Sequence, residues 1–117
     1  MVSPFMTKYK VVLVPFPFDD LSDAKVRPSI CLTNSIGPFN HIIIAFISSK
    51  IPDTLLSTDL LISKSENGFA LTGLTIDSVI RLHKMVTIPK SLIKRELGSI
   101  DEDLVLKVRT RLSALFD

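Results

Sequence analysis

The 117-residue sequence has one cysteine, Cys31, no tryptophan and only four glycines. A single cysteine excludes an intramolecular disulfide and any zinc site built from several cysteines, and it suits a reducing compartment. No apolar run approaches the roughly 18–20 residues that a membrane-spanning helix requires. The first residues lack the basic and long apolar regions of a signal peptide. We therefore expect a cytoplasmic protein that does not enter a membrane.

The sequence also lacks a large excess of charge of one sign, and it lacks the common catalytic motifs. The net charge of +2 is too small to indicate a nucleic-acid-binding protein by itself. No P-loop, G-x-G-x-x-G, H-E-x-x-H or G-x-S-x-G occurs, which removes nucleotide-dependent enzymes, zinc proteases and α/β-hydrolases as default assignments. The acids Asp19, Asp20 and Asp23 lack further ligand spacing, so we favour a solvated loop over a metal site. We expect no metal and no cofactor, and we expect Cys31 to be a buried side chain rather than a nucleophile.

The stretch around residues 11–28 organises the chain. Residues 11–14 are mostly β-branched and predict a buried strand, which Pro15 and Pro17 end because proline has no N–H for a sheet ladder. An acidic loop follows and ends at Arg27, just before a second apolar run. Arg27 therefore lies where a loop re-enters the sheet, a place where a charged side chain is both exposed and well positioned.

The remaining pattern predicts a compact α+β domain built mostly from strands. With 46% hydrophobic residues, the chain can bury a core as one domain, residues 1–117, in which residues 1–8 form a loose N-terminal extension. Apolar runs bounded by turn residues predict the strands 10–16, 29–34, 41–49, 55–62, 78–82 and 84–88. Residues 92–98 fit either a strand or a short helical turn. Ser99 and Glu102 have the spacing of a capping box, and a helical apolar stripe that ends at Phe116 predicts a C-terminal helix covering one side or end of the sheet.

Three segments, in this order, resemble the MazF/PemK-like toxins of type II toxin–antitoxin pairs. They are VLVPFPF at 12–18, KVRP at 25–28 and DSVIRLHKMVTIPKSLI at 77–93. The resemblance runs from about residue 10 to 116. It implies an SH3-like, CcdB/MazF-type β-barrel with a C-terminal helix that works as a homodimer. It also implies metal-independent cleavage of single-stranded RNA at short specific sequences, leaving a 2′,3′-cyclic phosphate, and a cognate antitoxin that covers the RNA site.

The resemblance also implies site residues. It assigns catalysis to Arg27, contact with the scissile phosphate to Ser48, and a further catalytic role to Arg81. His83 stands where PemK-type members carry an aspartate, and we predict that Arg81 and His83 help in charge stabilisation and proton transfer. The predicted RNA contacts around these residues are Phe18, Lys25, Pro28 and Ser49.

These residue types match the chemistry. Metal-free cleavage needs a base for the 2′-hydroxyl, an acid for the departing 5′-oxygen, and donors for the phosphoryl oxygens. Arginine matches phosphate geometry and stays charged, whereas histidine titrates near pH 6.5. Strand alternation places Arg81 and His83 on one face. A structural role is also open for each: Arg27 packed on Pro28, Ser48 bonding at a strand end, and Arg81 facing outward from a barrel.

Two other functions fit the same fold. One is a non-enzymatic, CcdB-like toxin that inhibits DNA gyrase by protein contact, which would not need Arg27 and Ser48. The other is a degenerate barrel that binds RNA and leaves it intact, with His83 marking the lost chemistry. The fold alone does not decide among the three.

Overall fold

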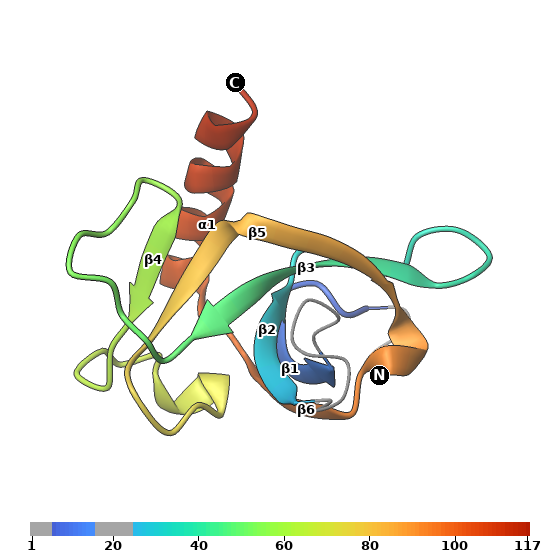
Figure 1. The fold of residues 1–117 in the computed structure, drawn as a ribbon, viewed down its shortest axis with the longest axis horizontal. Coiled ribbons are helices and arrows are strands. Elements are labelled where there is room, and N and C mark those ends of the chain that lie inside the picture. The colour runs from blue at the N-terminus through green and yellow to red at the C-terminus, as the bar shows by residue number, and fades with distance from the viewer. Residues whose placement is uncertain (1–5, 16–24) are drawn as a thin grey trace.

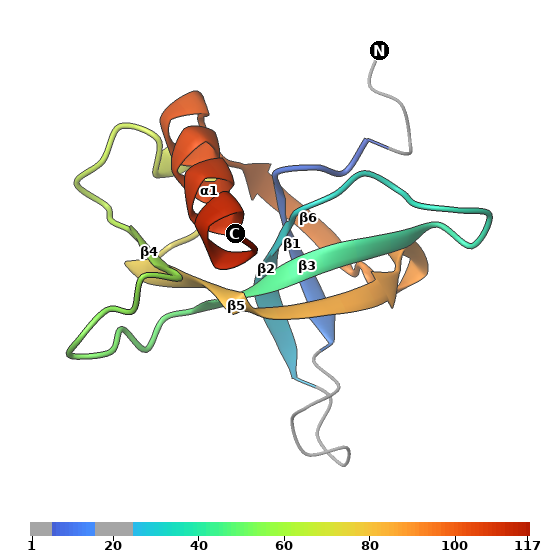
Figure 2. The same ribbon diagram turned by 90° about the horizontal axis from the view of Figure 1, so that it is seen from above.

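The computed structural model describes residues 6–15 and 25–117. Six antiparallel strands form one sheet in the order β4-β5-β3-β2-β1-β6, and the sheet curls into a half-barrel with helix α1 beside it (Figures 1 and 2). The strands are β1 (Lys10–Pro15), β2 (Val26–Cys31), β3 (His41–Ser48), β4 (Asp59–Ile62), β5 (Ser78–Pro89) and β6 (Arg95–Ser99). The helices are η1 (Ala70–Thr72), η2 (Lys90–Leu92) and α1 (Glu102–Leu115). This is the predicted, mostly-β α+β architecture.

Strand β3 lies inside the sheet, between β2 and β5. Its run of β-branched residues has no polar alternation because both of its faces are buried. Ile42 and Ile44 pack in one apolar cluster, together with residues such as Val12 and Cys31. Ala45 and Ile47 pack in the other cluster, on the opposite face. The predicted strand at 41–49 is therefore present as β3, and it is buried on both faces.

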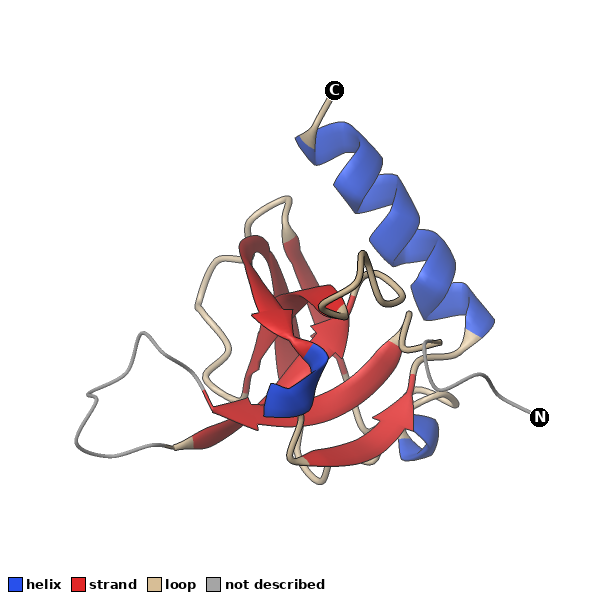
Figure 3. Ribbon diagram, turned by 90° about the vertical axis from the view of Figure 1, so that its right-hand side faces the viewer, coloured by secondary structure: helices blue, strands red, loops and turns tan. Residues whose placement is uncertain are grey.

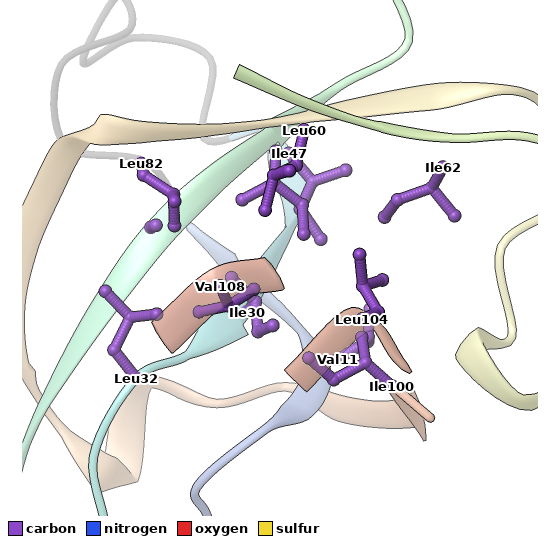
Figure 4. Packing of buried hydrophobic residues seen from close by; sticks show 12 residues of the cluster. Val11, Ile30, Leu32, Ile47, Leu60, Ile62, Leu82, Ile100, Leu104 and Val108 are labelled. Atoms are coloured by element: carbon purple, nitrogen blue, oxygen red, sulfur yellow. The ribbon is translucent and has the colours of Figure 1, made fainter. Parts of the chain in front are cut away.

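Helix α1 closes the larger cluster. Leu104 and Val108 are buried among strand residues that include Val11, Ile30 and Leu82 (Figure 4). The helix packs beside β5, and its C-terminal end points away from the sheet (Figure 3). The predicted apolar stripe is thus only partly used, because Phe116 is 73% exposed.

The start of α1 differs from the prediction. The residue that caps the helix is Asp101, whose side chain accepts a hydrogen bond from the Leu104 N–H at 3.0 Å. Ser99 is instead the last residue of β6. The capping-box assignment was wrong because Ser99 and Asp101 are both good N-cap residue types, and strand pairing with β1 holds Ser99 in the sheet.

Several predicted boundaries also move. The predicted strands 78–82 and 84–88 are one strand, β5, which carries an irregularity where its pairing with β3 jumps from Arg81 to Met85. The ambiguous stretch 92–98 contains the end of η2 and most of β6. Strand β4 begins at Asp59, and residues 55–58 precede it as loop.

The described part of the predicted N-terminal extension is anchored to the domain. Thr7 is buried, and its hydroxyl donates to the Thr33 carbonyl at 2.7 Å. The Lys8 N–H donates to the side-chain oxygen of Asn34 at 3.0 Å. Within the residues that the structure describes, no helix is both long and apolar enough to cross a membrane.

Candidate functional site

A large hollow lies at one end of the half-barrel. Because neighbouring strands are antiparallel, the ends of β1 and β3 meet the beginnings of β2, β5 and β6 there. They surround a cavity of about 640 Å³ together with residues 73–76. Its charged and hydroxyl-bearing lining residues are Arg27, Ser48, Ser49, Lys50, Thr75, Ser78 and Arg95.

Arg27 enters this cavity from the beginning of β2. It is half-buried and lies opposite Val14 in the β1–β2 register. Its guanidinium carbon stands 5.9 Å from the centre of the Phe46 ring, which is within the range of a cation–π contact. Phe46 also lines the cavity, so the aromatic ring supports the guanidinium at the place where a ligand would bind.

Ser48 lies at the end of β3, on the same cavity wall. Its hydroxyl oxygen accepts a hydrogen bond from the Lys50 N–H at 3.1 Å. This bond uses a lone pair and orients the hydroxyl, whose proton remains available to a ligand. The chain then turns through Ser49 and Lys50, which also line the cavity. The structure therefore brings Arg27 and Ser48, 21 positions apart in the sequence, into one site.

The cavity is cationic. Arg27, Lys50 and Arg95 line it, and its lining within the described residues contains no aspartate, glutamate or histidine. Apolar side chains such as Leu13, Phe46 and Ile76 form the rest of the wall. Cations beside apolar surface and hydroxyl donors suit a ligand that carries phosphate groups and flat, weakly polar parts.

Arg81 and His83 do not line this cavity. The Arg81 Nε donates to Asp59 Oδ1 at 2.8 Å, and Oδ2 of the same carboxylate accepts from the Leu56 N–H at 2.8 Å. His83 Nδ1 and the Thr58 hydroxyl are 2.7 Å apart in a hydrogen bond. Arg81 thus contacts Asp59, the first residue of β4, and His83 contacts Thr58, the residue before it. Arg81 is also paired with Phe46 across the β3–β5 register, which places it on the sheet face that carries Phe46.

The predicted RNA contacts divide in the same way. Pro28 and Ser49 line the cavity, whereas Lys25 is exposed and does not. Phe18 and the acids of the loop 19–23 lie outside the described residues. Sequence reasoning missed Lys50 and Arg95, although Lys50 directly follows two serines at the end of a predicted strand.

Two further possibilities receive no support from the described residues. Cys31 is fully buried, and this burial, assisted by the negative charge of Glu96, raises the pKa of its thiol to about 12. The thiol is therefore protonated and unreactive at neutral pH, as predicted for a buried side chain. Across residues 6–15 and 25–117, no three of histidine, cysteine, aspartate and glutamate gather in a group that would hold a metal ion.

The fold defines the chain as a small MazF-type barrel. The Mycobacterium tuberculosis toxin MazF-mt6 is 19% identical, with a TM-score of 0.70 over 92% of this chain and 96% of that chain. An endoribonuclease in complex with its cognate antitoxin, from a mycobacterial species, is 14% identical, with a TM-score of 0.66 over 92% and 90% of the two chains. A further M. tuberculosis toxin structure is 17% identical, with a TM-score of 0.66 over 90% of this chain and 98% of that chain. The predicted fold class is thereby confirmed.

Sequence comparison identifies the family directly. The profile of the PemK-like, MazF-like toxins of type II toxin–antitoxin systems matches residues 7–116. The chain therefore belongs to this toxin family, as the motifs at 12–18, 25–28 and 77–93 predicted. No curated protein sequence matches the chain.

Proposed function

We propose that this toxin is a metal-independent endoribonuclease that cleaves single-stranded RNA at short specific sequences. The observation that carries the proposal is the cavity in which Arg27 and Ser48 meet, with further cations and without a carboxylate in its described lining. Family membership supports the same activity, and one structural relative is an endoribonuclease. An RNA substrate also favours the predicted cytoplasmic location.

In this reaction the 2′-oxygen attacks the adjacent phosphorus and loses its proton, while the bond from phosphorus to the 5′-oxygen breaks. The products are a 2′,3′-cyclic phosphate and a 5′-hydroxyl, which receives a proton. Arg27, a permanent cation, stabilises the charge on the phosphoryl oxygens, and Ser48 donates its hydroxyl proton to one of them. Pro28 and Ser49 contact the RNA beside them.

Arg81 and His83 remain our candidates for electrostatic and proton-transfer support. Their strand is two strands away from that of Arg27, or about 10 Å by ordinary strand spacing. Arg81 shares the sheet face of Phe46, against which Arg27 stands. Arg81 would therefore act electrostatically from the far side of the Phe46 ring, because it does not line the cavity itself.

The test incubates the purified protein with a long single-stranded RNA in excess EDTA and maps the ends that form. The wild type should give discrete cuts with 2′,3′-cyclic phosphates, and Arg27→Ala should lower the rate at least about 100-fold, the size of effect expected when a charge-stabilising donor is lost. Arg109→Ala, which changes an exposed arginine of α1, is the matched control and should cut as the wild type does.

Intact RNA would contradict the proposal and favour one of the two other functions. Retained binding of RNA without cleavage would indicate the degenerate barrel. Inhibition of gyrase supercoiling that survives Arg27→Ala but not removal of the exposed Phe116 side chain would indicate the CcdB-like inhibitor.

We also propose that the toxin is a homodimer and that a cognate antitoxin covers the cavity. The exposed apolar side chains of Leu106 in α1, at 64%, and of Phe116 directly after it, at 73%, favour a protein contact on this helix. The relative solved with its cognate antitoxin supports the second partner. Sedimentation of the isolated toxin, and of the toxin with the purified antitoxin, tests both.

A further inference from the structure

Arg95 lines the same cavity as Arg27. Leu13 of β1 is paired with Pro28 of β2 on one side and with Arg95 of β6 on the other. The backbones of β2 and β6 are therefore two strand spacings apart, about 10 Å, with β1 between them. Arg27 and Arg95 thus approach the same cavity from opposite sides of β1.

The surroundings of Arg95 leave its charge available. The next residue, Glu96, forms an ion pair with Lys10 at 2.8 Å, so the carboxylate closest in sequence is directed to a different cation. Arg95 itself is exposed, and within residues 6–15 and 25–117 no hydrogen bond or ion pair occupies its guanidinium. An exposed arginine that lines a cavity and forms no ion pair with a described residue is well suited to bind an anion from solution.

We propose that Arg95 binds the phosphate adjacent to the scissile phosphate on the same RNA strand. This inference rests on the proposed function. RNA presents one phosphate per nucleotide, and Arg27 and Arg95 line one cavity whose wall also contains the apolar side chain of Leu13, against which a nucleoside can lie. Arg95 would contact substrate without touching the reacting atoms, so it is a binding residue that sets how the strand lies across the cavity.

The first test measures the affinity for a long oligouridylate as a function of salt concentration. Arg95→Gln should weaken binding about tenfold, the loss expected when a charge-assisted hydrogen bond is removed. It should also reduce the slope of log K against log salt by about 0.7, the contribution of one phosphate contact on a single strand. Arg95→Lys should keep the slope because it keeps the charge. Arg109→Gln is the matched control and should change neither quantity.

The second test uses a short RNA that spans a mapped cut, with a 2′-deoxy nucleotide at the cut so that it is bound but not cleaved. Each flanking phosphate is replaced in turn by a neutral methylphosphonate. At one flank, the loss from the methylphosphonate and the loss from Arg95→Gln should not add, because each change removes the same contact.

Two results would overturn the proposal: losses that add at both flanks, or a salt slope for Arg95→Gln equal to that of Arg109→Gln. Either leaves the proposed function intact, because cleavage that depends on Arg27 is measured separately. Conversely, RNA that stays whole would contradict the endoribonuclease, while the salt slope would still report whether Arg95 contacts a phosphate.

Discussion

The ion pair between Arg81 and Asp59 allows a sharp test of what Arg81 does. The Asp59 side chain is fully buried, whereas that of Arg81 is 20% exposed. The Asp59 carboxylate accepts two hydrogen bonds, and in Arg81→Ala it keeps only the one from the Leu56 N–H. Losing one partner of a buried pair costs roughly 3–5 kcal/mol. Because the truncated side chain lets water approach from the exposed side, we expect the lower end, about 3 kcal/mol.

The partner variant should cost less. In Asp59→Asn the amide oxygen still accepts a hydrogen bond, and Arg81 is near enough to solvent to turn toward water, so we expect a loss of about 1–2 kcal/mol. Urea unfolding of the wild type, both single variants and the double variant gives a double-mutant cycle. The double variant should be more stable than the sum of the losses predicts, with a coupling free energy of about 2 kcal/mol.

The same variants separate stability from catalysis. If Arg81 supports the reaction only by holding the fold, the cleavage rate of folded Arg81→Ala measured well below its unfolding midpoint should equal that of the wild type. A lower cleavage rate in Arg81→Ala, with an unchanged rate in Asp59→Asn, would instead support a direct electrostatic role of Arg81. A loss of stability below about 1 kcal/mol in Arg81→Ala would refute our reasoning about the buried carboxylate.

Three further predictions concern stability alone. A Cβ at Gly73, where φ is +73°, would overlap the Leu97 carbonyl, so Gly73→Ala should lower the free energy of unfolding in urea by at least about 2 kcal/mol. Gly37 has the same φ but open space around it, so Gly37→Ala should lower it by only about 1 kcal/mol. Asp101→Ala should cost about 1 kcal/mol through the lost N-cap, and Ser99→Ala should cost less than half of that if the cap is assigned correctly. Burial raises the pKa of the Cys31 thiol to about 12. The contribution of the buried thiol to stability is therefore complete below the ordinary pKa of 9.0 and is lost as the pH rises from there towards 12. Cys31→Ala should flatten this part of the curve of unfolding free energy against pH, measured by urea unfolding.

Much of the fold was predictable because local pattern and tertiary burial agree. Strand β3 reads as one buried run, and the end of β1 coincides with Pro15, where a ladder donor is missing. The boundaries that moved are those that pairing decides. Ser99 has the right residue type to cap α1, yet its pairing with Lys10 keeps it in β6, and Asp101 takes the cap.

The site was predictable only at positions where a short run of neighbouring residues indicates both a strand end and a polar side chain. Arg27-Pro28 and Ser48-Ser49 each stand at a strand end, and antiparallel pairing brings the two ends together. Arg95 could not be found in this way, because its segment fits two structures until β6 pairs with β1. The partner of Arg81 was equally hidden, since Asp59 lies 22 positions away and was placed inside a longer predicted strand.

The position of these charges follows from the core. Strands such as β3 are buried on both faces. A charged side chain within the sheet must therefore form an ion pair with another residue of the protein, as Arg81 does with Asp59. Cations that have to meet a substrate are therefore confined to strand ends, and an antiparallel half-barrel gathers those ends around one cavity. Charges at the ends should then serve function at little cost to stability, whereas removing the charge within the sheet should lower stability. Urea unfolding should accordingly separate Arg27→Ala and Arg95→Gln, each within about 1 kcal/mol of the wild type, from Arg81→Ala.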